Sequence, residues 1–195
     1  MNKTDRPRPG EFTNTKGTSP AGSYDSVSIA LHWLTAVLVV VQFLLAEFWD
    51  FFNRPTRHEM ITAHMSFGIL LGTVIVVRIL WRVAYGRKMP SAASGLAGAA
   101  AQFVHRAFYV LLAMQVVLGF ILRWSGNEAM SFFGLQLPPP FAPFSKAGHE
   151  VVDQFHNIVG WTIIVLAFGH ALFAILHHYV LKDGLLKRMA PALGR

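Results

Sequence analysis

Four long apolar segments, separated by polar stretches, dominate the pattern of hydrophobic and polar positions along the chain. They cover approximately residues 27–48, 60–83, 102–124 and 153–181. A helix needs about 20 predominantly apolar residues to cross the hydrocarbon core of a bilayer, and each segment is long enough. The pattern therefore predicts an all-α fold, an integral membrane four-helix bundle that occupies residues 26–182.

The segments outside these helices differ in composition. Residues 1–25 are rich in Pro, Gly, Ser, Thr and charge and hold too few apolar groups to form a core, which predicts a disordered N-terminal tail. Residues 183–195 form a basic C-terminal tail. The loop between the third and fourth helices contains Pro138–Pro140 and several phenylalanines, a composition that favours a segment lying on the membrane surface.

The distribution of basic residues predicts the orientation of the bundle. Four helices place both termini on one side, and that side holds most of the 17 lysine and arginine residues. Because positively charged flanks stay in the cytoplasm, both termini are predicted to be cytoplasmic. The formal net charge of +7 is then a membrane-topology signal, and no nucleic-acid partner is expected. Four basic residues fall on the opposite, outer side: Arg54, Arg57, Arg123 and Lys146.

The chain contains no cysteine. This excludes disulfides, iron–sulfur clusters, thiolate metal sites and covalent attachment of a c-type haem. Any redox cofactor must therefore be held by histidine, and any haem must be bound non-covalently.

The spacing of histidines along the last helix is the most informative feature of the sequence. His156 and His170 are fourteen residues apart, which on an α-helix brings them within about 40° of each other and about 21 Å apart along the axis. With the orientation above, His64 and His156 lie near the outer face, and His32 and His170 near the inner face. The sequence therefore predicts two histidine pairs at two depths.

Two histidines per level fit a haem better than a zinc or copper ion. A haem brings four nitrogens of its own and needs two axial ligands, whereas two histidines without a carboxylate fill a metal shell poorly. A small residue follows each predicted ligand by four positions, leaving room for the porphyrin: Ala36, Gly68, Gly160 and Ala174. His105 is followed at that spacing by Tyr109, so we expect it to hydrogen-bond an inner haem propionate, with Arg106 or Arg78 as charge partner. The predicted cofactors are two bis-histidine haem b groups.

A different interpretation is a haem-free transporter or channel that uses its histidines structurally. Such proteins usually need a carboxylate deep in the membrane, and the central part of each predicted helix has no Asp or Glu. Electron transfer across the bundle is therefore favoured over transport of protons or ions.

Four motifs stand out along the predicted helices: SIALHWLTAV in the first, ITAHMSFG followed by VVRILWR in the second, FVHRAFYVLL in the third, and the paired histidines of a fourth helix that ends in HHYVLKD. Together these motifs resemble the bacterial cytochrome b561 family. The resemblance covers roughly residues 26–189. It implies a four-helix, two-haem electron carrier of the bacterial inner membrane, and it places the family's axial ligands on His32, His64, His156 and His170. His105 also matches a family histidine.

The best understood type in that family takes an electron from superoxide on the periplasmic side and passes it to ubiquinone. By this resemblance we expect a superoxide:quinone oxidoreductase, in which the anion is drawn to the outer haem by Arg54, Arg57 and Lys146, with help from His58 and His149. An alternative is a cytochrome b anchor subunit that carries electrons between a periplasmic dehydrogenase or hydrogenase and the quinone pool. The sequence leaves the oligomeric state open, with a homodimer among the alternatives.

Overall fold

Four long helices form the protein, as the hydrophobicity pattern predicts. The computed structural model describes residues 23–86, 95–182 and 184–191. Its main elements are α1 (Ser26–Phe48), α2 (Arg54–Ala84), α3 (Gly95–Ser125) and α4 (Lys146–Leu176). Each is long and apolar enough to cross a membrane. The predicted membrane-spanning four-helix bundle is therefore confirmed.

Three helices begin about two turns before the starts that hydrophobicity predicts. The Asn53 side chain accepts a hydrogen bond from the backbone N–H of Thr56 at 3.1 Å and caps α2. Ser145 caps α4 in the same way, with the N–H of Gly148 at 3.2 Å. These caps satisfy otherwise unpaired N–H groups, so the helices extend beyond their apolar segments.

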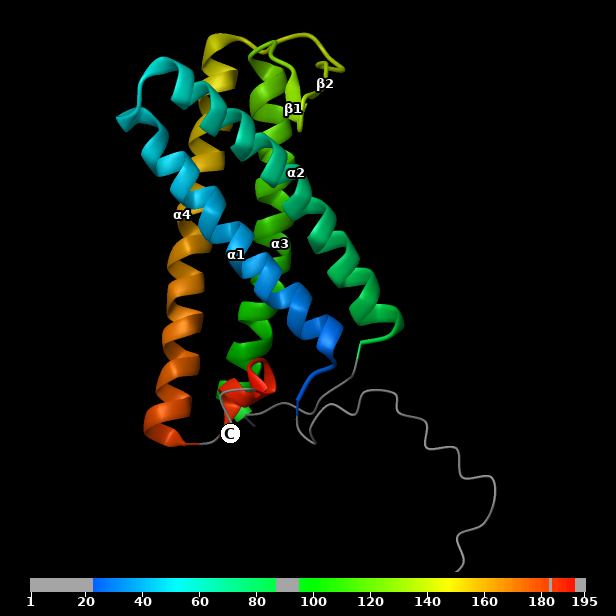
Figure 1. Cartoon of the computed structure of the whole chain (residues 1–195), viewed down its shortest axis with the longest axis vertical. Coiled ribbons are helices and arrows are strands. Elements are labelled where there is room, and N and C mark those ends of the chain that lie inside the picture. The colour runs from blue at the N-terminus through cyan, green and yellow to red at the C-terminus, as the bar shows by residue number, and fades with distance from the viewer. Residues whose placement is uncertain (1–22, 87–94, 183, 192–195) are drawn as a thin grey trace, which may run out of the picture.

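The chain passes up and down, so its connections gather at two ends (Figure 1). We call the end that holds the start of α1 and the C-terminal turn η3 (Leu185–Arg188) the terminal end, and the opposite end the loop end. The loop end carries the short turn η1 (Trp49–Phe51) and two strands, β1 (Met130–Phe132) and β2 (Leu135–Leu137). Helix α1 packs mainly on α2, and α3 on α4.

The middle of the bundle contains a small apolar core. Its fully buried members come from all four helices: Leu38, Leu71, Val74, Ile75, Leu112, Val159 and Ile163. Many other large apolar side chains on the helices are exposed in the isolated chain. In a membrane these side chains contact acyl chains, which is why the predicted lipid environment agrees with the structure.

The long third loop folds into an antiparallel β-hairpin, which the sequence did not predict. Met130 pairs with Leu137 across the hairpin, and the turn uses the positive φ of 94° at Gly134. The N–H of Phe133 donates to the hydroxyl of Ser66 on α2 at 3.0 Å. The first strand is thus attached to the bundle, although the loop was expected only to lie on the membrane surface.

Most of the predicted N-terminal tail lies outside the described residues, whereas residues 184–191 of the predicted C-terminal tail are described. Where they are described, they contact the terminal end: the N–H of Tyr24 donates to the carbonyl of Arg188 at 3.1 Å. The indole N–H of Trp33 donates to the carbonyl of Met189 at 2.9 Å. These bonds hold η3 against the start of α1.

Asp25 joins two helices at the terminal end, which leads to a stability prediction. One carboxylate oxygen accepts from the N–H of Ser28 at 2.8 Å, capping α1, and from the indole of Trp81 on α2 at 3.0 Å. Asp25→Ala removes both bonds and should lower the free energy of unfolding by about 1–2 kcal/mol. Trp81→Phe keeps the α1 cap and removes the bond between the helices together with part of the ring that contacts Tyr85. An SDS titration of the purified protein measures both, and an unchanged midpoint for Asp25→Ala would contradict this role.

Candidate cofactor site

The structure brings together the two histidine pairs that the sequence predicts. Toward the loop end, His64 on α2 and His156 on α4 have ring centroids 6.3 Å apart. Toward the terminal end, the rings of His32 on α1 and His170 on α4 are 6.4 Å apart. We call these the loop-end pair and the terminal-end pair. One helix, α4, contributes to both.

The separation of the rings suits two imidazoles that share one metal ion. An imidazole nitrogen binds a transition metal at about 2.0 Å and lies roughly 1.1 Å from its own ring centroid, so two rings on opposite sides of one ion would have centroids about 6.2 Å apart. Both observed spacings lie close to this value. Among the described residues, no cluster of three or more His, Cys, Asp or Glu side chains could hold a bare metal ion. The donor set thus fits a cofactor that brings most of its ligands with it.

The loop-end pair is fixed in place by neighbouring helices. Nδ1 of His64 donates to the backbone carbonyl of Gln42 on α1 at 3.1 Å, which leaves Nε2 available for a metal. The side-chain amide of Gln115 on α3 donates to Nε2 of His156 at 3.2 Å. Nδ1 of His156 is buried and has no hydrogen-bond partner in the described part of the chain. Because Nε2 accepts this bond, Nδ1 carries the proton of the ring and is a buried donor without an acceptor.

Gly68 and Gly160 leave space one turn after each histidine of the loop-end pair. A Cβ atom at Gly68 would lie 2.8 Å from the amide nitrogen of Gln42, and one at Gly160 would lie 3.1 Å from that of Gln115. A side chain at either position would therefore displace a glutamine. Both glycines thus border residues that contact the loop-end pair, while the room for a porphyrin beside them stays a prediction.

The terminal-end pair has charged and aromatic neighbours. His105 on α3 lies with its ring 5.6 Å from that of His170. Arg78 on α2 donates to Nδ1 of His32 at 3.2 Å and lies 5.5 Å from the ring centroid of Tyr109. Of the two arginines predicted to accompany His105, Arg78 is therefore at the site, whereas Arg106 is exposed on α3.

The cations predicted to attract substrate all lie at the loop end. Arg57 forms an ion pair with Asp50 at 3.0 Å, and Lys146 approaches Glu150 at 3.9 Å. Arg54 is exposed in the first turn of α2. A further pair joins the remaining basic residue of this end, Arg123, to Glu128. The loop end is therefore a mixed-charge surface rather than a purely basic one.

Sequence reasoning did not single out Gln42, Gln115 or Trp49. The ring of Trp49 in η1 lies 5.5 Å from that of His64. The two glutamines had a visible signal, because each is a polar residue in the middle of an apolar helix. Such residues are expensive in a membrane and usually have a partner.

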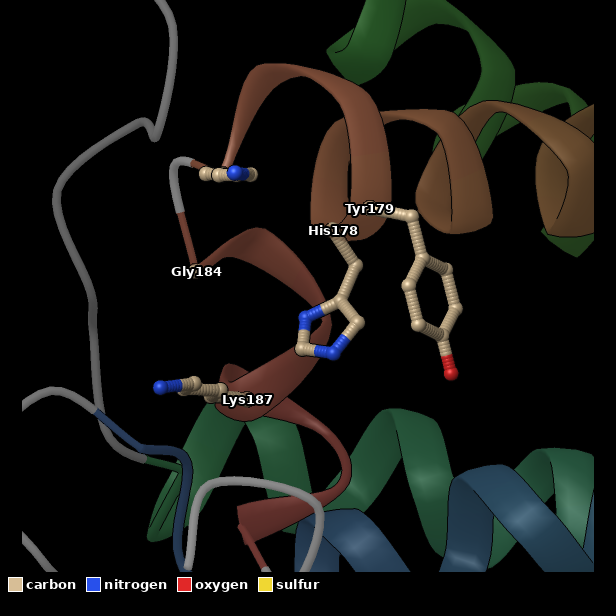
Figure 2. A pocket seen from close by; sticks show the side chains of 5 residues that line it. His178, Tyr179, Gly184 and Lys187 are labelled. Atoms are coloured by element: carbon tan, nitrogen blue, oxygen red, sulfur yellow. The ribbon is translucent and has the colours of Figure 1, made fainter.

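A cavity of about 320 Å³ lies beyond the paired histidines, where α4 ends (Figure 2). It lies between the π-helical turn η2 (His177–Leu181) and η3, and Figure 2 shows the side chains of His178, Tyr179 and Lys187 around it. It does not border either histidine pair. We therefore treat it as separate from the cofactor site.

A membrane bundle that holds pairs of histidines in its interior belongs to the class of membrane cytochromes b. The sequence profile of the prokaryotic cytochrome b561 family matches residues 23–192, and the chain belongs to this family. It is therefore a multi-pass electron-transfer protein of the bacterial inner membrane that binds haem b. The pairing of His64 with His156 and the glycines one turn after them fit such a group.

Named relatives match almost the whole chain. Cytochrome b561 homolog 2 of Escherichia coli (strain K12) is 31% identical over 185 residues, which cover 91% of this chain and 94% of the relative. The probable superoxide oxidase CybB of Yersinia pestis is 29% identical over 171 residues, with 86% and 96% covered. Cytochrome b562 of Cereibacter sphaeroides is 27% identical over 172 residues, with 85% and 94% covered.

The glycines beside the loop-end pair allow a test of the site on one helix. Gly160→Leu should lower the haem content of the purified protein, because the new side chain takes the space next to His156. Gly169→Leu is the matched control, since a Cβ at Gly169 meets nothing within 4 Å. The haem-to-protein ratio, measured optically after reduction, distinguishes them. Equal ratios in the two variants would contradict the placement of haem beside Gly160.

Proposed function

We propose that this chain binds two non-covalent haem b groups and passes electrons from superoxide at the periplasmic side to ubiquinone in the membrane. The observation that carries the proposal is that α4 meets two other helices at two depths with matched pairs of histidine rings. The choice of superoxide is supported by the relative from Yersinia pestis that is named a probable superoxide oxidase.

Each histidine pair would hold one haem in this proposal. The bound haem supplies one-electron redox chemistry, and two histidines leave no open coordination position for oxygen. His64 is held in the required tautomer by the carbonyl of Gln42. The apolar core between the two pairs excludes water from the middle of the bundle.

Arg78 and His105 are proposed to bind the haem propionates at the terminal end. Arg78 now donates to Nδ1 of His32. A neutral imidazole that binds iron through Nε2 carries its proton on Nδ1 and cannot accept this bond. If iron binds His32, the guanidinium of Arg78 must therefore move away from Nδ1. It is then available to bind an anionic group next to the ring of His105.

The overall reaction is balanced by two superoxide anions for each quinone. Each superoxide loses one electron and becomes O₂, and ubiquinone takes up two electrons and two protons and becomes ubiquinol. Arg54, Arg57 and Lys146 are proposed to attract the anion to the loop end. Arg54 is the strongest candidate, because the two others lie next to carboxylates.

The proposed direction requires the loop end to face the periplasm and the termini to face the cytoplasm. The chain has no cysteine, so single cysteines can be introduced and labelled. A membrane-impermeant maleimide added to intact spheroplasts should label Phe51→Cys, which is in the exposed turn η1, and not Lys187→Cys in η3. Lys187→Cys should react only after the membrane is permeabilised. The opposite labelling pattern would contradict the proposed topology.

Single histidine variants test the pairing of ligands. His64→Ala and His156→Ala should each perturb the same haem centre in the reduced optical spectrum and in a redox titration. His32→Ala and His170→Ala should perturb the other centre. His58→Ala is the control, because His58 is exposed near the start of α2 and belongs to neither pair, and it should keep two six-coordinate centres. If His156→Ala and His170→Ala each leave both centres intact, the assignment fails.

Superoxide-dependent reduction of the haem-loaded protein tests the substrate. Replacing Arg54 and Arg57 by Ala should slow reduction about two- to tenfold at low ionic strength and flatten its salt dependence, because steering by charge is screened by salt. Asp50→Asn should act in the opposite direction, since it removes the carboxylate beside Arg57. If a superoxide source does not reduce protein that dithionite reduces fully, superoxide is excluded as the donor.

A further inference from the structure

The cavity between η2 and η3 lies at the level where lipid headgroups surround a membrane protein. The apolar stretch that contains α4 and can cross the membrane ends at Leu181. The chain then reverses through two residues with positive φ, Lys182 at 54° and Gly184 at 73°, and η3 packs against η2 and α4. Because the apolar stretch ends there, the cavity lies at the boundary between acyl chains and headgroups.

The cavity has a positively charged lining. Its described lining residues include two lysines and no acidic residue: His178, Tyr179, Lys182, Gly184 and Lys187. Within the described residues, neither lysine forms an ion pair with a carboxylate. Asp183, between them in the sequence, lies outside the described residues. Two ammonium groups without a paired carboxylate favour an anionic ligand.

The cavity also has hydrogen-bonding capacity that the described chain does not use. The ring of His178 extends from η2 toward η3 (Figure 2), and its buried Nδ1 has no hydrogen-bond partner in the described ranges. The Lys187 side chain folds back over the turn, since a Cβ atom at Gly184 would lie 3.8 Å from its Cδ. Buried polar groups are normally paired, so this lining fits a ligand with acceptor oxygens.

Apolar side chains lie directly beside the charged ones along η2. Val180 and Leu181 are 66% and 61% exposed, and Leu176 at the end of α4 is 46% exposed. In a membrane such side chains contact acyl chains, whereas a lysine at this level places its ammonium group among the headgroups. The surroundings of the cavity therefore match a molecule with an anionic head and apolar chains better than a soluble anion.

We propose that this cavity binds the headgroup of an anionic phospholipid, with Lys182 and Lys187 contacting its phosphodiester and His178 donating a hydrogen bond to a headgroup oxygen. Basic pockets beside membrane helices suit this chemistry, because each lysine near an anionic lipid adds to the binding. A zwitterionic headgroup carries an ammonium group of its own, which the two lysines repel. The site uses none of the paired histidines, so its failure would leave the proposed function unaffected.

Native mass spectrometry of the haem-loaded protein in detergent tests the site. The protein is titrated with phosphatidylglycerol and, separately, with phosphatidylethanolamine that has the same acyl chains. Phosphatidylglycerol should bind about fivefold more tightly, or better. Lys182→Gln and Lys187→Gln should each weaken its binding about fivefold, because each removes one positive charge from the cavity. Lys182→Arg and Lys187→Arg keep the charge and should retain most of the affinity.

Arg106→Gln is the matched control, because it removes one exposed positive charge on α3 that does not line the cavity. It should leave the affinity for both lipids unchanged. The haem-to-protein ratio of each variant shows whether the bundle is retained. Inorganic phosphate, added as a competitor, distinguishes a lipid from a soluble anion and should not displace phosphatidylglycerol, because it has no acyl chains.

Three results would overturn the proposal. Equal affinity for the two lipids would show that the cavity does not select an anionic headgroup. A loss of binding in Arg106→Gln as large as in the lysine variants would show that only the overall charge of the chain attracts the lipid. Displacement of the lipid by inorganic phosphate, with the same dependence on Lys182 and Lys187, would assign the cavity to a soluble anion.

Discussion

The placement of His156 and His170 on one face of α4 is the constraint on which the rest of the structure depends. Their separation of about 21 Å along the helix requires two partners at different depths, and no single neighbouring helix supplies both. Helix α2 brings His64 to the loop-end level and α1 brings His32 to the terminal-end level. Because the helices run alternately up and down, α4 can contact α2 at one depth and α1 at the other.

The polar groups inside the bundle are arranged around the two histidine pairs. A buried imidazole in a membrane needs partners, and each of the four rings has one or more among neighbouring side chains or backbone carbonyls. The ends of the bundle are held by separate interactions, the Asp25–Trp81 bond at one end and the attachment of the hairpin to Ser66 at the other. These bonds hold α2 at two levels along its length and join it to α1 and to the hairpin.

The sequence predicted the helices and the histidine pairs well because both follow from simple periodicity and length. It misplaced the starts of α2 and α4 because the capping side chains of Asn53 and Ser145 extend a helix beyond its apolar part. The hairpin was missed because its register depends on contacts with Ser66, more than sixty residues earlier. The contacts of Gln42 and Gln115 depend on how each helix is rotated in the bundle, which one-dimensional patterns do not specify.

The central claim is that two histidine pairs hold two haems in one chain. Electron paramagnetic resonance of the oxidised, purified protein, combined with the haem-to-polypeptide ratio, tests it most directly. The account predicts two low-spin ferric signals and two haems per chain, because all four axial positions are filled by histidine. A single haem per chain, or a high-spin ferric signal from an iron with an open position, would contradict it.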